Sequence, residues 1–272
     1  MSRVVVLVSD LHAGSTYGIM PPSFHIKEGN EIGLNKTQKW LWESWQDCWK
    51  WFDKLIGKDP WSLISLGDAI DGYHHGTTEV WSTDESEHGI AAYHVLKKPA
   101  LEAESVYIIE GTEVHTKGNE HGLAYTLSNK GANVVMPKGE GGAWRNLKLD
   151  IAGTYCKFDH HIGTTSRPYL EASQLSIVMG CERQEAARAG HRVPKVIGRA
   201  HRHRFGHFDD GDGSCFVLPP WQTVTRYGRK VVPHAIPQVG IVVLDWRNCE
   251  DNSTPVVHKH LHTIKEAPHQ AL

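Results

Sequence analysis

VVVLVSDLH, residues 4–12, opens with five apolar residues, four of them β-branched valines. Such a run predicts a buried β-strand, because branched side chains pack well on a pleated surface. The strand would deliver Asp10 and His12 at its carboxyl end, where open α/β sheets bind their ligands. If the backbone stays extended there, both side chains point the same way, since they lie two residues apart. The stretch therefore predicts an α/β fold with a metal-competent pair at a strand end.

Length, charge and cysteine usage narrow the class of protein. The 272 residues predict a single α/β domain spanning 1–272, and the net charge of −2 excludes a global basic field for nucleic acid. Five cysteines form no C-x-x-C pair, which indicates a reducing compartment. The apolar run after Met1 is too short for a signal peptide, and no stretch approaches a membrane span. We therefore expect a soluble, cytoplasmic protein that needs no membrane; its oligomeric state stays open.

Periodicity and turn signals predict the remaining elements. Helices are expected where apolar residues recur every three or four positions, and strands where they alternate or form short runs. Asn35 and Gln38 form a predicted capping box, and Gly57 ends the helix that they begin. Further helices are expected at 87–97, 120–129 and 168–189, and further strands at 61–66, 106–110, 134–136, 144–151, 154–159, 195–198, 215–218, 239–245 and 255–264.

Metal-type side chains follow several of these strands, and histidine is abundant at 19 residues. Each pair alone is common by chance, but the repetition after apolar strands is not. A mixed Asp/His set without thiolate suits Mn, Fe, Zn, Ni or Co, and suits Ca or a structural Zn poorly. The segments are Asp10-x-His12, Gly67-Asp68, Gly111–His121, His160-His161 and His201-x-His203.

The order D-x-H, G-D, G-T-x-x-H, H-H and H-x-H resembles the motif series of the calcineurin-like metallophosphoesterases. The resemblance runs from Val4 to about His203, and GIVVLDW looks like the closing strand of the family. It implies two stacked mixed β-sheets flanked by helices, an α/β (α+β) four-layer sandwich. It also implies two divalent transition-metal ions, with manganese favoured. Position by position, one metal would be held by Asp10, His12 and His203, Asp68 would bridge, and the other would be held by His201 and by His160 or His161, with His160 preferred.

The third motif departs from the family pattern, G-N-H-D/E. Thr112 stands where the family has its Asn ligand, and Glu113 stands where it has its catalytic His. The second metal would then take Thr112, Asn119 or Glu113 as a substitute ligand. His115 is the candidate general acid, and Glu113 would orient it or serve as a ligand. This G-T-x-x-H form is similar to that of divergent, often phage-encoded members, which would place the protein in a host cytoplasm.

The resemblance implies hydrolysis of phosphate mono- or diesters. Two cations about 3.5–4 Å apart can clamp an in-line displacement at phosphorus and supply a bridging hydroxide. The substrate would be a phosphate ester such as a nucleotide or nucleic acid. Two alternatives stay open: a DNA-processing nuclease of the same fold, and a non-catalytic metal-binding scaffold.

Three further residues near these motifs have two interpretations each. Asp71 would either hold a ligand histidine through its second nitrogen or cap the turn that follows it. His75 lies on a long loop and is a candidate substrate contact, or simply a solvated histidine. Arg199 precedes the H-x-H motif and would contact phosphate, or else form a salt bridge.

Overall fold

The computed structural model describes residues 2–139, 141–163, 167, 170–233 and 236–264, and its first five-stranded sheet is built around the valine run. β1 (Val4–Val8) is fully buried at the centre, in the order β12-β11-β1-β4-β5. β4 (Ser62–Leu66) and β5 (Ser105–Ile109) run parallel to it, whereas β11 (Gln238–Asp245) and β12 (Val256–Thr263) are antiparallel to their neighbours. An all-apolar strand at the centre of a covered sheet is what the sequence predicts.

The second sheet also has five strands, in the order β6-β7-β8-β10-β9. β6 (Leu147–Ile151) and β7 (Thr154–Phe158) form the hairpin predicted around Gly153. β8 (Val196–Arg199) lies parallel to both β7 and β10 (Ser214–Val217), and β9 (Gly206–Asp209) is antiparallel to β10. Both sheets are therefore mixed.

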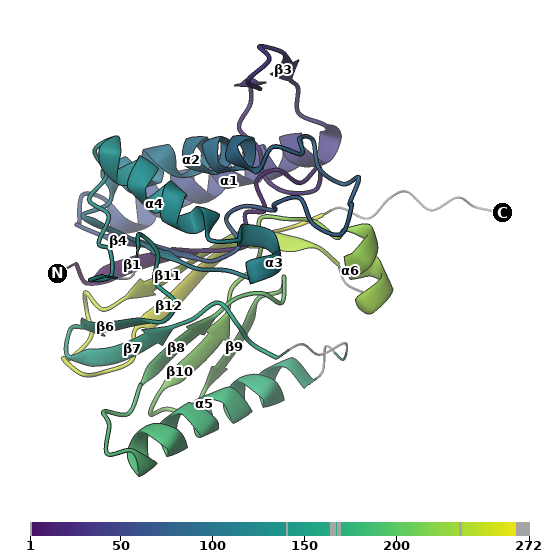
Figure 1. Cartoon of the computed structure of the whole chain (residues 1–272). Helices are drawn as coiled ribbons and strands as arrows, with labels where there is room; N and C mark the ends of the chain where they lie inside the picture. The colour runs from purple at the N-terminus through teal and green to yellow at the C-terminus, as the bar shows by residue number, and fades with distance from the viewer. Residues whose placement is uncertain (1, 140, 164–166, 168–169, 234–235, 265–272) are drawn as a thin grey trace.

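Helices cover the outer face of each sheet (Figure 1). α1 (Lys36–Ile56), α2 (Glu85–Glu102) and α4 (Asn119–Asn129) lie over the first sheet, and α5 (Glu171–Arg188) lies over the second. One apolar core fills the space between the first sheet and its helices, a second joins the two sheets, and a third lies under α5. This four-layer arrangement confirms the predicted fold class.

α1 begins and ends where the sequence predicts. The Asn35 side chain accepts a hydrogen bond from the Gln38 amide at 2.9 Å, and the Gln38 side chain accepts one from the Asn35 amide at 3.2 Å. Gly57 follows the helix with φ +63°, a conformation that glycine adopts without the usual steric penalty. Trp40, Trp42 and Trp51 of α1 are partly buried against the core.

Several short elements were predicted wrongly or missed. The strand expected at 134–136 is absent, because Val134 makes only an isolated bridge to Val106. α2 extends beyond the predicted range 87–97 at both ends. The expected start of α5, Pro168, lies outside the described residues. Sequence periodicity missed β9, the two-stranded hairpin of β2 (Phe24–His25) and β3 (Glu31–Ile32), and the short helices α3 (Glu113–Thr116) and α6 (Arg226–Val231). Each of these is shorter than the window over which a period can be recognised.

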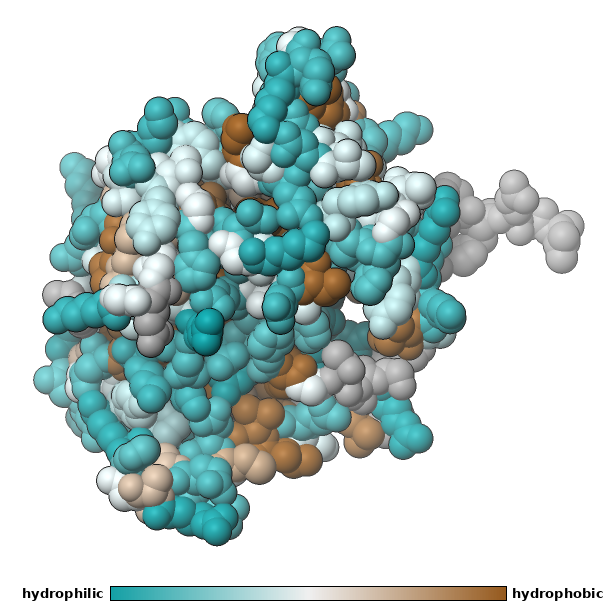
Figure 2. All heavy atoms as spheres, viewed as in Figure 1, coloured by the Kyte–Doolittle hydropathy of each residue, from teal (hydrophilic) through white to brown (hydrophobic). Residues whose placement is uncertain are grey.

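Hydrophilic residues predominate on the molecular face shown in Figure 2, and hydrophobic residues form only small scattered groups there. Within the described part of the chain, no helix combines the length and the apolarity that crossing a bilayer requires.

Candidate metal centre

The loops that follow β1, β4, β5, β7 and β8 bring the predicted ligands together at one edge of the paired sheets. Five of these residues have positive φ: Asp10 (49°), His12 (44°), Asp68 (48°), His201 (71°) and His203 (53°). The premise of an extended backbone at Asp10 and His12 was therefore wrong. Left-handed backbone costs a non-glycine residue roughly 1–3 kcal/mol, and such strain gathers at functional sites.

Asp10, His12 and His203 form the first half of the cluster, with one ligand atom of each within 4.8 Å of the others. The two Nε2 atoms of His12 and His203 are 3.1 Å apart, and His203 Nε2 is 3.4 Å from Asp10 Oδ1. His12 Nδ1 lies 2.8 Å from Asp71 Oδ1. A proton on Nδ1, donated to Asp71, leaves the Nε2 lone pair facing the cluster. Of the two interpretations of Asp71, the structure thus favours the one in which it holds a ligand histidine.

Asp68, His160 and His201 form the second half. His160 is fully buried and donates from Nδ1 to the carbonyl oxygen of Leu66 at 2.7 Å, so its Nε2 is free to face Asp68 Oδ2 at 3.1 Å. His201 and the exposed His161 lie beside it, with ligand atoms of the three histidines within 4.8 Å. His160 is the better-placed member of the His160–His161 pair, because it alone is in contact with Asp68.

Thr112 lies in the middle of this second half. Its hydroxyl oxygen is 3.2 Å from Asp68 Oδ2, 3.1 Å from His201 Nδ1 and 3.4 Å from His160 Nε2. Its amide also donates to Asp68 Oδ1 at 2.6 Å. Of the three substitute ligands proposed for the second metal, Thr112 is therefore the one whose side-chain oxygen lies beside Asp68, His160 and His201. Asn119 instead donates its side-chain amide to Glu85 Oε2 at 3.2 Å.

Observations of this structure fit a cation in the cluster. Asp10 Oδ1 is buried and has no hydrogen-bond partner among the described residues. Burial would raise the pKa of Asp68, yet the charges of His160 and His12 hold it well below its usual range. Burial lowers the pKa of His160, but Asp68 and Asp10 raise it to about 10. A proton between His160 Nε2 and Asp68 Oδ2 occupies the lone pairs that a divalent cation would bind. These imidazole and carboxylate donors therefore fit a divalent metal.

His115 lies on α3 at the rim of the first half. Its Nδ1 is 2.9 Å from the carbonyl oxygen of Asp71, and its ring centre is 4.8 Å from that of His12. Burial and the charge of His12 lower the pKa of His115 to about 4. Glu113, at the start of the same short helix, is exposed.

The two candidate substrate contacts are placed differently. His75 is exposed and its ring lies 5.6 Å from that of His74; it is His74 whose ring packs at 4.5 Å on His115. Arg199 is buried and forms an ion pair with Glu182 of α5. The salt-bridge interpretation of Arg199 therefore fits the structure.

Two glycines allow the ligand loops to approach one another. A Cβ at Gly111 would lie 2.1 Å from Asp68 Oδ1, and one at Gly67 would lie 2.4 Å from His160 Nδ1. Any side chain at these positions would displace Asp68 or His160, two of the candidate ligands. The glycines before Asp68 and Thr112 are therefore part of the centre.

Sequence analysis missed Glu120, a fully buried carboxyl on α4. Its Oε1 accepts the amide of Ala69 at 3.2 Å, and its Oε2 accepts the amide of Gly111 at 2.7 Å. Burial and the charge of Asp68 raise the pKa of Glu120 to about 8. The side chain thus joins the loop after β4 to the loop after β5. The only signal in the sequence was its place within the third motif segment.

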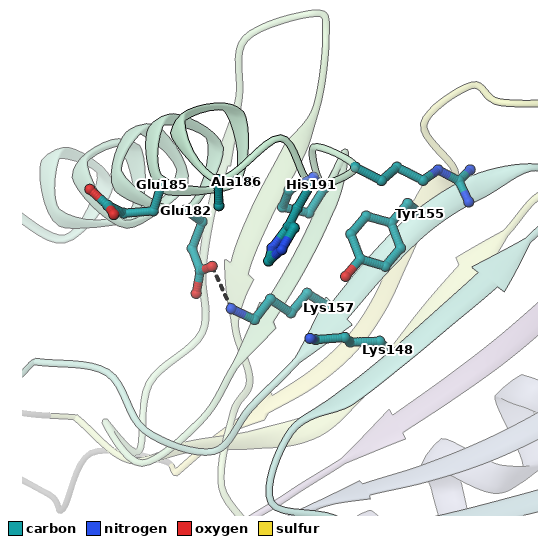
Figure 3. A pocket seen from close by; sticks show the side chains of 10 residues that line it. Lys148, Tyr155, Lys157, Glu182, Glu185, Ala186 and His191 are labelled. Carbon is teal, nitrogen blue, oxygen red and sulfur yellow. Dashed lines mark hydrogen bonds and ion pairs between the residues drawn. The ribbon is translucent and has the colours of Figure 1, made fainter.

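A cavity of about 270 Å³ lies elsewhere, between α5 and the second sheet (Figure 3). Tyr155 and Lys157 of β7 line it together with Glu182, which pairs with Lys157. None of the predicted ligands lines this cavity.

No protein-family model matches the chain, and no curated protein matches it. Among solved structures it is similar to an archaeal phosphodiesterase, at 10% identity and a TM-score of 0.45 over 95% of this chain and 99% of that one. It is also similar to a putative 5'-nucleotidase from Staphylococcus aureus, at 11% identity and a TM-score of 0.42 over 99% of this chain and 55% of that one. Vps29 from Entamoeba histolytica complexed with zinc is similar at 10% identity and a TM-score of 0.38, over 96% of this chain and 98% of that one. The likeness is a distant one of fold, and the activity is therefore inferred from the chain's own residues.

Proposed function

We propose that the chain is a metal-dependent phosphoesterase with a dinuclear centre. Asp10, His12 and His203 would hold one divalent cation, and Asp68 would bridge to a second. His160 and His201 would hold the second cation, with the Thr112 hydroxyl in place of an Asn ligand. Manganese, iron, zinc, nickel and cobalt all suit such carboxylate and imidazole donors.

The observation that carries this proposal is the contact between His12 and His203. With His12 Nδ1 bound to Asp71, two imidazole nitrogens that lie 3.1 Å apart face one another beside the unpartnered Asp10 Oδ1. Lone pairs in such contact repel unless a proton or a cation lies between them. The same arrangement recurs between His160 Nε2 and Asp68 Oδ2.

The chain's own residues would complete the chemistry. When bound, a pair of cations lowers the pKa of water and neutralises charge on a phosphoryl group. Asp68 would fix the separation of the two halves, because its Oδ2 lies 3.8 Å from His12 Nε2 in the first half and 3.1 Å from His160 Nε2 in the second. His115 has its Nδ1 on the Asp71 carbonyl, so Nε2 is the nitrogen available to protonate a leaving alkoxide. An anionic phosphate beside the ring would favour its protonated form.

Turnover of an aryl phosphate monoester and an aryl phosphate diester by the chelated, metal-reloaded protein tests the proposal. We expect hydrolysis with at least one of Mn, Fe, Zn, Ni or Co. His12→Ala and Asp68→Ala should lower it by more than about 100-fold, since loss of outer-shell partners alone typically costs 10–100-fold. Asp212→Ala, an exposed carboxylate in the turn before β10, is the matched control. If the protein binds metal stoichiometrically but hydrolyses neither ester, the proposal that it is an enzyme is contradicted.

The leaving group tests the role of His115. His115→Ala should slow hydrolysis of alkyl esters far more than that of nitrophenyl esters, because a poor leaving group needs the proton. A typical general-acid contribution is about 10²–10⁴-fold. Equal losses for both ester types would contradict the assignment.

Including single- and double-stranded DNA as substrates separates a nuclease from a small-molecule phosphoesterase.

A non-catalytic metal-binding scaffold is the second candidate. It is favoured by one observation: the exposed Glu113 stands where the family has its catalytic His. In that case metal would bind with full stoichiometry, and no phosphate ester would turn over with any of the metals.

A further inference from the structure

The edge of the first sheet carries a second group of metal-type side chains, outside the proposed centre. His260 and His262 lie two residues apart on β12, the edge strand, and face α1. Cys48 of α1 is fully buried beneath them. The thiol sulfur and one nitrogen of each imidazole lie within 4.8 Å of one another.

Asp47, the neighbour of Cys48 on α1, adds a fourth donor. Its Oδ2 is 2.8 Å from His260 Nε2 and 3.3 Å from His262 Nε2. The edge of a tetrahedron with metal–nitrogen bonds of about 2.0 Å is about 3.3 Å long, so these are also distances between ligands of one ion. A contact of the sulfur with either imidazole would need to shorten from at most 4.8 Å to about 3.5 Å, which side-chain rotation can supply.

Three features argue that this group is more than a pair of surface ion pairs. His262 Nε2 is buried and makes no hydrogen bond to any described residue, although Asp47 is near. The Cys48 thiol makes only a long contact, 3.6 Å, to the carbonyl oxygen of His260. The ring of His260 is held in place by stacking on Trp51, with ring centres 5.0 Å apart and planes at 11°. His260 has a hydrogen-bond partner in Asp47, but the His262 nitrogen and the Cys48 thiol beside it lack a close one.

We propose that Cys48, His260 and His262, with Asp47 as the fourth ligand, form a separate zinc-type site that fastens β12 to α1. Thiolate, imidazole and carboxylate are all donors that Zn²⁺ accepts, most often with four ligands in tetrahedral geometry. β12 is the outermost strand of its sheet, so a metal link to α1 would protect an edge that is otherwise free to fray. Burial raises the pKa of the Cys48 thiol to about 12, so metal binding would release a proton there.

Cobalt spectroscopy on the 272-residue chain distinguishes this site from the proposed phosphoesterase centre, which contains no thiolate. Titration with Co²⁺ should produce a sulfur-to-cobalt charge-transfer absorption in the near ultraviolet. The band should persist in Asp68→Asn and in the matched cysteine control Cys249→Ser. It should vanish in Cys48→Ser and in the His260→Ala/His262→Ala double variant. A wild-type protein without the band, or a Cys48→Ser protein that keeps it, would overturn the proposal.

Zinc stoichiometry provides a second readout should Cys48→Ser fold poorly. Equilibrium dialysis against Zn²⁺ should give one bound ion fewer per chain for the His260→Ala/His262→Ala variant than for wild type. The variant should retain hydrolysis of aryl phosphate esters, because neither histidine belongs to the proposed centre. Equal zinc content in a folded double variant would refute the site.

Discussion

The imidazole of His12 shows how one residue of the centre is oriented by another. Its Nδ1 is hydrogen-bonded to Asp71 Oδ1 at 2.8 Å, so only Nε2 is available to bind a cation. Gln222 donates a longer hydrogen bond, 3.4 Å, to the same Asp71 oxygen and helps to hold the carboxylate in place. A carboxylate on the far nitrogen raises the basicity of a metal-ligating histidine and fixes its tautomer.

Asp71→Asn should therefore weaken metal binding without removing any ligand. An amide can turn either its oxygen or its NH₂ toward Nδ1, and it loses the negative charge in both cases. We expect metal affinity to fall by about 10–100-fold, measured by titration of the chelated protein with Mn²⁺. Asp212→Asn, which removes an exposed carboxylate, should leave the affinity unchanged. Unaltered affinity in Asp71→Asn would show that Asp71 does not orient His12.

Spacing along the sequence predicted which side chains cluster together better than it predicted the geometry of the cluster. The Asp10-x-His12 and His201-x-His203 pairs could be recognised because each follows an apolar strand. Their left-handed backbone could not be foreseen, since it depends on contacts between loops far apart in the chain. Glu120 was missed because a glutamate near the start of a helix is ordinarily a solvated residue.

The elements of the fold that could be predicted are those whose apolar pattern repeats over many residues. β1, β4, α1 and the β6–β7 hairpin carry clear patterns and were found. α3 has four residues, and its place at the rim of the centre follows from the Asp71–His115 contact rather than from any pattern. α4 was predicted as a helix, but its role in joining the two ligand loops arises only from the tertiary contact of one side chain.

α4 should accordingly control the geometry of the centre through Glu120. In Glu120→Gln, an NH₂ group must face either the Ala69 or the Gly111 amide, which leaves a buried donor unsatisfied at a cost of about 1–3 kcal/mol. We expect that loss of unfolding free energy in urea, accompanied by weaker metal binding, because both loops carry ligands. Glu104→Gln, an exposed substitution of the same chemistry, should change neither quantity. Wild-type stability in Glu120→Gln would mean that the loops are held by other contacts.

At the scale of the whole molecule, the centre gathers negative charge that the fold must tolerate. Asp10, Asp68 and Asp71 are all buried. Histidine charges hold the pKa of each of the three aspartates below its usual range against the effect of burial. Like charges brought together in a site of low dielectric destabilise the folded chain unless cations or protons neutralise them. Stability and occupancy of the centre should therefore be coupled.

Removing divalent metal should lower the melting temperature of the entire chain. A cation that binds only the folded state adds about 2.7 kcal/mol at 100 times its dissociation constant. For a domain of this size that corresponds to a rise of about 5 °C, measured by calorimetry of chelated and Mn²⁺-reloaded protein. Zn²⁺ is avoided here because the α1–β12 site would bind it too. In Asp68→Ala the rise should shrink, because the carboxylate that contacts both halves is gone. An equal rise in that variant would place the stabilising cation elsewhere and remove the thermodynamic support for a centre at the strand ends.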